Sequence, residues 1–597
     1  DKFERIRNVL ASGLIGLKNE QILTKGLLTL TLLNNFLLVE NESEKNQDTT
    51  AFVPIPLKRL NMVLRDLNGW LESEFAFEKE FIAIRIQLLI FVNSYLNISD
   101  SSEVLVNSTM FDFAFNLFRE SIGVVSVEQQ NIELQMLVIP LEYFVLKNFI
   151  ILNKNRESMN VWEDEIEGTY NELVDILLNS PNNQKDKSNQ PIILIQDLLV
   201  RIFSSIIPLK KMEIFYDEFF NLVNGRNLII QRLGTDVLYK LILEKQQAFT
   251  IEYELLKSKF SKSDNNEDDE DLKKAVLPEQ LLSNVLNPPE EYIEYEDRPE
   301  TARFLWSWYL IFAHFKDITH GIRLDYTNQL KEKDLINKLL NFVFHQIDIV
   351  DDNDFLKQLT EDSIKNYHVI ENDYIYRNVT TELKHLIVHL YYLTFQNLGS
   401  STLAWFVNIR NRQLKSNIEK FSIKHISPIV INEELDRATE VISKNMNDDE
   451  NLSIRINRIT HEIKSVYLID EKTMEMVIKI PSSYPLLNVL VEGPLRIGVK
   501  ENQWRAWLLA SQRVITSHNG TIIDAIELFN KNVSLHFSGF EECAICYSIL
   551  HYQDSSLPTK TCTTCNNKFH AGCLYKWFKS SGASSCPLCR STFNFRK

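Results

Sequence analysis

The sequence predicts a mostly α-helical protein in three parts: a long stack of helices, a small α+β domain and a C-terminal zinc finger. Only 16 glycines and 16 prolines occur among 597 residues, too few for the many turns of β-sandwiches or β-barrels. Apolar residues recur at helical spacing through about residue 440, and all seven cysteines lie between Cys543 and Cys589. The shares of apolar residues (44%) and charged residues (24%) exclude a wholly disordered chain.

Residues 1–445 are expected to form the helical part. Residues 81–90 and 383–390 are examples in which apolar side chains recur at positions i, i+3, i+4 and i+7 over a wide face. Helices this apolar must pack in layers, which favours a solenoid of helix pairs of the HEAT or armadillo kind. One irregular helical domain is the alternative, because the sequence has no clear short-period repeat motif.

Polar interruptions divide this helical part. They lie at residues 41–50, 181–191, 261–274 and 287–300. The third contains the acidic run 264–271, and so dense a block of like charge is expected to be a solvated loop. A partner-binding tail is the alternative for that run.

The negative charge of the chain is unevenly distributed. The formal net charge is −16, of which residues 1–445 carry −19 and residues 446–597 carry +3. An acidic body binds nucleic acid poorly, so any contact with RNA or a ribosome surface is expected from the C-terminal part. The first 542 residues contain no cysteine, which excludes a disulfide framework there and indicates a reducing compartment, the cytosol.

No membrane-spanning or signal segment is expected. The longest apolar stretches, such as residues 86–92 and 304–315, are shorter than the ~18 residues that a spanning helix needs. The N-terminus has no apolar core of a signal peptide. Because the chain begins at Asp1 without an initiator methionine, we expect it to be the C-terminal portion of a longer protein.

Residues 446–538 are expected to form the α+β domain. After a polar break at 447–450, residues 452–470 are rich in β-branched and aromatic residues, and residues 474–480 alternate as a half-buried strand does. A hairpin turn is expected at 470–473, a second extended run at 484–494, and helices at 501–517 and 521–530. This order of elements is typical of an α+β domain, and together with the Tyr-Pro segment at 484–485 it resembles an RWD domain.

Residues 539–597 contain eight candidate zinc ligands in four pairs, each pair separated by two residues. The pairs are Cys543 with Cys546, Cys562 with Cys565, His570 with Cys573, and Cys586 with Cys589. Two thiolates at this spacing reach one tetrahedral ion, so eight ligands make two zinc sites, and the pairs could bind consecutively or interleaved. A domain of about 50 residues has too small a core to fold alone, so two structural Zn²⁺ ions are expected to stabilise it.

This ligand order resembles that of RING and PHD fingers, which interleave their pairs. The resemblance implies that one zinc is held by Cys543, Cys546, His570 and Cys573, and the other by Cys562, Cys565, Cys586 and Cys589. All four ligands of each zinc are then protein side chains, so no coordination position stays open for a reacting water. His551 lies between the first two pairs and is expected to be a surface-loop residue instead of a ligand.

The residues between the ligands favour a RING over a PHD finger. A PHD finger typically has a tryptophan two positions before the seventh ligand, where this chain has Ser584. A RING typically has an apolar residue in the first knuckle, apolar residues in the helix after the sixth ligand, a proline in the last knuckle and often a basic residue after it. Here these are Ile545, Leu574, Trp577, Pro587 and Arg590, and the resemblance implies that they dock a ubiquitin-loaded conjugating enzyme (E2). A role in the domain core is the alternative for Trp577.

The cysteine count limits the chemistry. Every cysteine is a candidate zinc ligand, so no thiol remains to carry ubiquitin as a thioester. A RING-type E3 of this kind would act by docking the loaded E2 and orienting ubiquitin, without a covalent intermediate. The alternative function is a non-enzymatic, PHD-like zinc-finger adaptor on a helical scaffold.

Three stretches resemble the listerin family of RING-type E3 ubiquitin ligases: 541–550 (EECAICYSIL), 568–578 (KFHAGCLYKWF) and 586–590 (CPLCR). The resemblance implies that the chain acts in ribosome-associated quality control, in the cytosol. There it would bind the 60S ribosomal subunit, join other quality-control subunits and ubiquitinate stalled nascent chains for proteasomal degradation. It also implies that an N-terminal region of the family is missing here. Candidate ribosome contacts are Arg496, Lys500, Arg505 and Arg513, although a solvated helix face explains them equally well.

Overall fold

The computed structural model describes residues 2–44, 55–100, 108–156, 162–180, 190–260, 274–289, 299–349, 353–370, 379–445, 452–469 and 472–593. It divides into two compact units, Asp1–Leu241 with Val369–Tyr376 and Ile242–His368 with Arg377–Lys597. Several expectations from the sequence lie outside the described residues. These are most of the four polar interruptions, the acidic run 264–271, the polar break at 447–450 and the hairpin tip at 470–471.

The first unit is built of helices. They are α1 (Lys2–Gly13), α2 (Asn19–Gln21), α3 (Leu27–Glu44), α4 (Leu57–Leu71), α5 (Ile82–Asp100), α6 (Ser108–Glu128), α7 (Gln135–Lys154), α8 (Trp162–Ile166), α9 (Tyr170–Asn179), α10 (Gln190–Arg201), α11 (Leu209–Met212), α12 (Tyr216–Val223) and the start of α13 (Leu228–Phe260).

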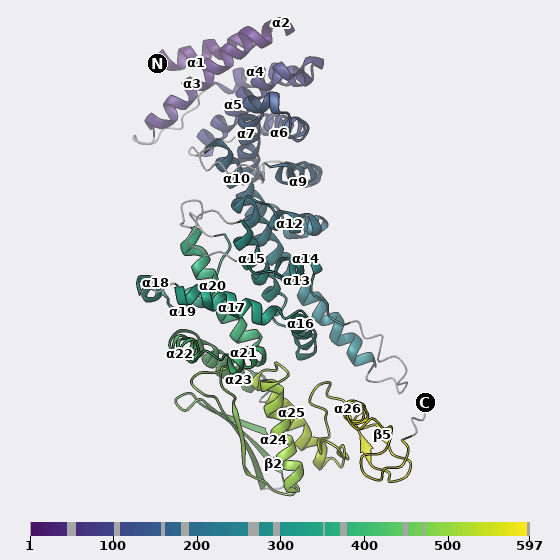
Figure 1. Cartoon of the computed structure of the whole chain (residues 1–597). Coiled ribbons are helices and arrows are strands. Elements are labelled where there is room, and N and C mark those ends of the chain that lie inside the picture. Colours follow the sequence, from purple (N-terminus) through teal and green to yellow (C-terminus); the bar gives the residue numbers. More distant parts are fainter. Residues whose placement is uncertain are drawn as a thin grey trace. The chain divides into compact units, whose positions relative to one another are not determined.

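These helices stack in two layers (Figure 1). In one layer α3 packs on α5, α5 on α7 and α7 on α10. In the other, α4 packs on α6 and α6 on α9, and α6 also contacts α5 and α7 across the layers. Paired layers of this kind bury the wide apolar faces that the sequence shows, and they confirm a HEAT-like helical stack.

Helix α7 corrects the expectation that no segment reaches membrane-spanning length. Ile132–Lys154 is long and apolar enough to cross a membrane, although Glu142 and Lys147 interrupt its apolar run. The segments Pro191–Ile206 and Leu209–Val223 pass the same test together, but they are bent by 116°. Helix α7 packs against α5, α6 and α10, and burial raises the pKa of Glu142 to about 8. Packing in the helical stack therefore accounts for part of its apolar surface, since 39% of the apolar window is buried.

The second unit begins with the rest of α13 and continues through further helices. They are α14 (Glu279–Asn284), α15 (Pro299–Ala313), α16 (His320–Glu332), α17 (Leu335–Ile349), α18 (Asn353–Gln358), α19 (Glu361–Lys365), α20 (Val379–Asn397), α21 (Gly399–Asn408), α22 (Arg412–Phe421) and α23 (Ser427–Asn445). The most buried is α15, whose Trp306 and Trp308 are at most 1% exposed, and it packs on α20.

The sheet domain (residues 452–538) follows α23. Strands β1 (Leu452–Asn457), β2 (Glu462–Ile469), β3 (Lys472–Lys479) and β4 (Leu490–Leu495) form an antiparallel meander in the order β1-β2-β3-β4. Buried residues alternate along β2 and β3, and α24 (Glu501–Thr516) and α25 (Ile522–Phe537) pack beside the sheet (Figure 1). The predicted meander followed by two helices is confirmed.

Two details of the sheet domain differ from the sequence expectation. Of the extended run expected at 484–494, only the segment from Leu490 is a strand, because Ser482–Leu487 forms turns in which Tyr484 and Leu486 are buried. Helix α25 also continues to Phe537 instead of ending near residue 530. That extension places Asn532 and Val533, both buried, on the helix.

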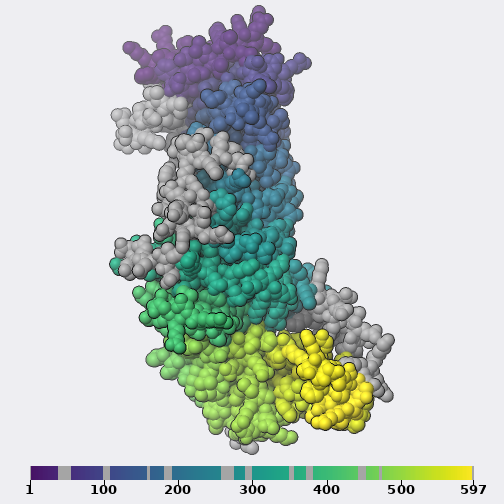
Figure 2. All heavy atoms as spheres, viewed as in Figure 1, coloured from purple at the N-terminus to yellow at the C-terminus, as the bar shows by residue number. Residues whose placement is uncertain are grey.

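The RING domain (residues 541–593) ends the described chain. It contains the short strands β5 (Lys560–Thr561) and β6 (Lys568–Phe569), which pair antiparallel, and one helix in this range, α26 (Ala571–Ser581). In Figure 2 its surface, in yellow, adjoins that of the sheet domain.

A close helix contact in the first unit gives a first prediction. Gly234 of α13 lies so near α12 that an added Cβ would be 2.9 Å from Leu222 Cβ and 3.1 Å from the Phe219 carbonyl oxygen. Gly234→Ala is therefore expected to destabilise this unit by about 1–3 kcal/mol, through overpacking against backbone that cannot yield. The measurement is thermal unfolding of the full chain by far-ultraviolet circular dichroism.

Gly123→Ala is the matched control. Gly123 lies inside α6, and an added Cβ would meet no described atom within 4 Å. Because alanine is the better helix former, this change should stabilise by about 0.5–1 kcal/mol. Equal melting of the two variants would contradict the close approach of α12 and α13.

Candidate zinc centre and docking face

The eight candidate ligands meet in two clusters. Within each cluster one ligand atom per residue lies within 4.8 Å of the other three. The first cluster contains Cys543, Cys546, His570 and Cys573, and the second contains Cys562, Cys565, Cys586 and Cys589. The pairs therefore alternate between clusters along the chain, as in the cross-brace of a RING.

Three of the four pairs are built by the same local turn. The residue after the second cysteine has a positive φ in each: Tyr547 (59°), Asn566 (56°) and Arg590 (61°). Its amide donates to the carbonyl of the first cysteine of the pair, at 2.7, 2.9 and 3.0 Å respectively. This left-handed closure turns both thiols of a pair toward one point.

The fourth pair is built by the start of α26. His570 is the N-cap residue of this helix and Cys573 follows one turn later, so both side chains lie at its amino end. The His570 Nε2–H donates to the Ile549 carbonyl (2.9 Å), which leaves Nδ1 facing Cys546 Sγ at 3.4 Å and Cys573 Sγ at 3.8 Å. A metal-binding histidine is commonly held by such a hydrogen bond from its other nitrogen.

The donor chemistry fits zinc. Hydrogen bonds from Cys546 and Cys573 lower the pKa of Cys543, while hydrogen bonds with Cys543 and Cys546 raise the pKa of Cys573. Thiols this close cannot all ionise unless a cation lies among them, and thiolate and imidazole are ligands that Zn²⁺ prefers. Two clusters of four protein donors fit two zinc ions in closed sites, which are structural and leave no position for a reacting water.

The metal clusters also organise the small core of the RING domain. Cys543, Cys562, Cys573 and Cys586 are buried together with Phe569, Leu574 and Phe593. Leu574 is 1% exposed, so the structure corrects its expected docking role: it packs beneath the surface instead of lying on it. Sequence position within α26 could not separate these roles.

The other expected docking residues reach the surface. Ile545 and Pro587 are half-buried in the first and last knuckles, Arg590 is exposed, and Trp577 on α26 is 36% exposed. The Trp577 Nε1–H donates to the Ser585 carbonyl (3.1 Å), which fixes the ring beside the last knuckle. Sequence reasoning missed Leu588, which is 50% exposed between Pro587 and Cys589. The position of Leu588 between two zinc ligands, Cys586 and Cys589, is the sequence feature that could have predicted its exposure.

His551 is not the surface residue that the sequence suggested. It is 1% exposed, its Nδ1 lies 3.0 Å from Asp554 Oδ1, and an added Cβ on Gly572 would approach its ring to 3.2 Å. It belongs to neither donor cluster. Hydrogen bonds from His551 and Ser556 lower the pKa of Asp554, outweighing the burial that raises it.

The sheet domain holds the RING domain directly. Trp507 of α24 donates from Nε1 to the Tyr547 carbonyl (3.2 Å), and Gln503 donates from Nε2 to Glu542. Asn532 of α25 accepts three hydrogen bonds from residues 548–550 of the first knuckle.

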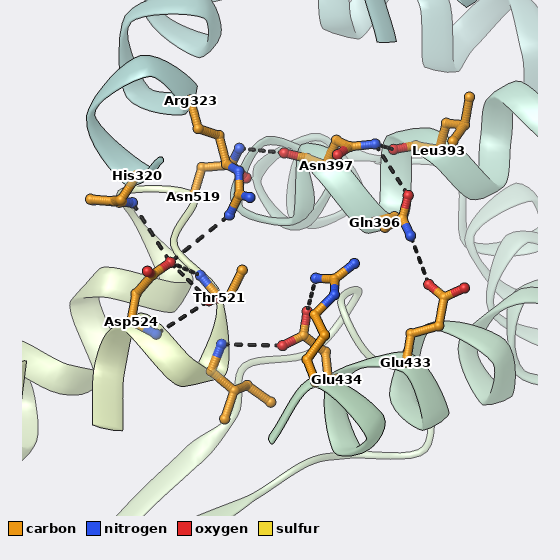
Figure 3. Close-up of polar contacts among 12 residues, drawn as sticks. His320, Arg323, Leu393, Gln396, Asn397, Glu433, Glu434, Asn519, Thr521 and Asp524 are labelled. Atoms are coloured by element: carbon orange, nitrogen blue, oxygen red, sulfur yellow. Dashed lines mark hydrogen bonds and ion pairs between the residues drawn. The ribbon is translucent and has the colours of Figure 1, made fainter. Parts of the chain in front are cut away.

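The sheet domain is joined in turn to helices α16, α20, α21 and α23 by a polar network around the start of α25 (Figure 3). Glu434 of α23 accepts from the Ile522 amide (3.2 Å) and from Arg437 (3.0 Å), and burial raises its pKa while Arg437 opposes this. Asp524 lies 3.9 Å from both His320 and Arg323 of α16.

Asn519 forms the other half of this joint. It has a positive φ of 57° and is buried. Its Nδ2 donates to Thr327 Oγ1 (3.2 Å) and to the Asn397 carbonyl, and its Oδ1 accepts from the Ser400 amide (3.4 Å).

The four basic residues proposed for ribosome contact are spread over the sheet domain. Arg496 follows β4 and Lys500 precedes α24, and both are exposed. Arg505 and Arg513 are both exposed and lie eight residues, or just over two turns, apart on α24. Arg505 also pairs with Glu501 at 2.5 Å, a fully solvated contact that is worth little.

Comparison with known families matches these parts one by one. Residues 208–439 match the LTN1 family HEAT repeat region, residues 452–536 a ubiquitin conjugating domain-like model, and residues 541–590 a Ring finger domain. The chain is 38% identical to the E3 ubiquitin-protein ligase listerin of Saccharomyces cerevisiae over 610 residues, which covers 100% of this chain and 38% of that protein. The chain belongs to the listerin family.

Other listerins match more narrowly. Listerin of Schizosaccharomyces pombe is 34% identical over 465 residues, covering 76% of this chain and 28% of that protein. Listerin of Mus musculus is 30% identical over 349 residues, covering 54% of this chain and 19% of that protein. The chain thus spans less than two fifths of the length of each of these listerins.

The clusters give a second prediction. Cys546→Ala is expected to unfold the RING domain and to reduce bound zinc from two ions per chain to one or fewer, because a structural site that loses a ligand no longer offsets the small core. The sheet domain and the cysteine-free helices should remain folded. The measurements are zinc content by elemental mass spectrometry and helix content by circular dichroism.

Thr564→Ala is the control, since Thr564 is exposed inside the second knuckle and is not a candidate ligand. It should keep two zinc ions. A global loss of helix in Cys546→Ala would contradict the modular arrangement.

Proposed function

We propose that this chain is the ligase end of a RING-type E3 ubiquitin ligase. The observation that carries the proposal is the pair of interleaved, closed donor clusters with apolar side chains that reach the surface in their knuckles and on α26. These are the exposed Trp577 and Leu588 and the half-buried Ile545; with the exposed Arg590 they are called the docking face. An aromatic anchor within a small apolar patch is typical of a protein-docking surface.

Bound zinc would hold the knuckles in place, and this chain's residues would do the positioning. The docked E2 carries ubiquitin as a thioester, and a substrate lysine amine attacks its carbonyl carbon. The C–S bond breaks, an amide bond forms, the amine nitrogen loses one proton to solvent, and the thiolate leaves on the E2. Ile545, Trp577 and Pro587 would seat the E2, and Arg590 would contact ubiquitin, so that the thioester is held in one reactive orientation.

The donor thiol of this proposal lies outside the 597 residues of this chain. All seven cysteines of the chain lie in the two clusters, and residues 452–536, although they match a ubiquitin conjugating domain-like model, contain no cysteine. The sheet domain therefore serves as a structural or binding module in this proposal. The partners are a separate E2 and ubiquitin.

The substrate proposal follows the family. The relatives are named E3 ubiquitin-protein ligases. We infer that this chain acts with other quality-control subunits in the cytosol, on nascent chains stalled on the 60S subunit, and marks them for the proteasome. The positive balance of residues 446–597, against the acidic helical part, supports ribosome contact through the C-terminal part.

Trp577→Ala is expected to slow discharge of ubiquitin from a loaded E2 by on the order of 30-fold or more, the loss typical of removing an aromatic anchor. The measurement is single-turnover discharge to free lysine by the full chain, across a panel of E2 enzymes. Zinc content and helix content should stay unchanged.

Tyr575→Ala is the control. Tyr575 is 69% exposed on the same helix, two residues away and so on a different side of it. It should discharge at the wild-type rate. If Trp577→Ala and Tyr575→Ala both discharge ubiquitin at the wild-type rate, the result would contradict the role of the docking face in binding the E2. A zinc-loaded wild type that discharges no E2 would favour a non-enzymatic adaptor.

A further prediction concerns the ribosome. The double substitution Arg505→Glu with Arg513→Glu is expected to weaken co-sedimentation with 60S subunits, because it places two negative charges against phosphate. It should also lower the salt slope of binding by about one for each phosphate that is no longer neutralised. Lys531→Glu is the control for Arg505→Glu alone, since each change alters the net charge by two and each base is exposed and pairs with a glutamate four residues earlier. Equal weakening by these two single substitutions would indicate only a change in net charge.

A further inference from the structure

A single buried side chain of the sheet domain organises the first knuckle of the RING domain. Asn532 of α25 is 1% exposed. Its Oδ1 accepts from the Ser548 hydroxyl (2.9 Å), the Ile549 amide (2.9 Å) and the Leu550 amide (3.0 Å). Its Nδ2 donates to the Leu528 carbonyl of its own helix (2.8 Å), which fixes the orientation of the amide.

The same residue, Ile549, reaches the metal cluster through its carbonyl, which shares a peptide unit with the Leu550 amide bound by Asn532. The Ile549 amide donates to Asn532, and the Ile549 carbonyl accepts from His570 Nε2 (2.9 Å). His570 then presents Nδ1 to Cys546 and Cys573. Asn532 is therefore connected to the first cluster through one backbone segment and one histidine.

The opposite end of α25 is fixed to the helical part. Its first amide, that of Ile522, donates to Glu434 of α23, and its third residue, Asp524, faces Arg323 and His320 of α16 (Figure 3). An unsatisfied amide at a helix start is commonly capped by a nearby side chain. The Thr521 side chain caps the Asp524 amide from within the chain, and Glu434 of α23 caps the Ile522 amide. Moving α25 away from α23 would therefore leave the Ile522 amide unpaired.

The connection between α25 and the RING domain is short. Helix α25 ends at Phe537, and the first ligand is Cys543. Within this connection Gly539 has a positive φ of 85°, and the Phe540 amide donates back to the Leu535 carbonyl (3.1 Å). The chain turns tightly back on the helix instead of forming a flexible tether.

We propose that α25 sets the orientation of the RING domain and that Asn532 is the positioning residue at this contact, as an outer partner of the first zinc site. Glu434 and Asp524 fix the amino end of α25 to the helical part. Asn532, in the second half of α25, fixes the first knuckle to the helix. The RING domain would then hold one direction relative to α16 and α23. This inference concerns the metal site and the joint, and it stands whether or not the chain discharges ubiquitin.

The test is metal release from the full chain loaded with Zn²⁺ and, in parallel, with Co²⁺, whose absorption distinguishes a Cys₃His site from a Cys₄ site. Asn532→Leu keeps the size of the side chain and removes the acceptor. It is expected to release one ion, from the Cys₃His site, about tenfold faster to excess chelator, the low end of losses seen for outer-shell partners. The Cys₄ site should keep its rate.

Hydrogen exchange gives an independent readout. In Asn532→Leu the Ile549 and Leu550 amides lose their acceptor, so they should exchange faster. The Cys562 and Cys586 amides, bonded to the Asn567 and Ser591 carbonyls within their own knuckles, should be unchanged.

Two further variants make the result decisive. Asn532→Asp keeps the acceptor but places a carboxylate oxygen where the Nδ2–H donated to the Leu528 carbonyl, so it is expected to restore the slow exchange of the Ile549 and Leu550 amides only in part. Ser534→Ala, at an exposed position of the same helix, should match the wild type.

Three outcomes would overturn the proposal. The first is wild-type release in Asn532→Leu. The second is equal acceleration of both ions together with melting of the sheet domain, which would indicate a merely structural role. The third is unchanged exchange of the Ile549 and Leu550 amides in Asn532→Leu, which would remove the hydrogen bonds as the cause.

Discussion

The C-terminal part of this chain depends on bringing four soft donors within 4.8 Å of one another, twice. Thiols at such distances compete for protons, and they can all become thiolates only around a cation. Most of the RING domain follows from that constraint. The knuckle turns, the start of α26 at His570 and the position of Trp577 beside the last knuckle are all set by where the ligands must meet.

The constraint also explains how much of the site could be predicted. Ligand spacing is a local property of the sequence, so the pairs and the helix after His570 were visible in it. Whether a given apolar or polar side chain is exposed is not local. The RING pattern predicts a docking role for Leu574, and the position of His551 between the first two pairs predicts a surface loop, but both side chains are 1% exposed. The left-handed residues that close the knuckles carry no common side chain and give no sequence signal.

The same distinction holds for the fold. Helical periodicity predicted the two-layer stack, and strand alternation predicted the meander. Periodicity failed where tertiary packing overrides it. Helix α7 resembles a membrane span by composition until its neighbours α5, α6 and α10 are known, and Ser482–Leu487 turns inward although its sequence reads as extended. The joint at Asn519 joins residues more than 100 positions apart, which no single-sequence pattern encodes.

The joints are polar for a physical reason that bears on the proposed chemistry. An enzyme without its own nucleophile accelerates transfer by holding two partners in one geometry. A RING domain that rotates freely would hold that geometry for a smaller fraction of the time, and the rate of transfer would fall. Apolar interfaces tolerate small rotations, because contact area changes slowly as surfaces slide. A buried asparagine does not: displacing the first knuckle from Asn532, or α25 from Glu434, leaves buried donors unpaired at about 1–3 kcal/mol each. Hydrogen bonds at both ends of α25 therefore select an angle as well as a contact, which apolar packing of the same size would not do.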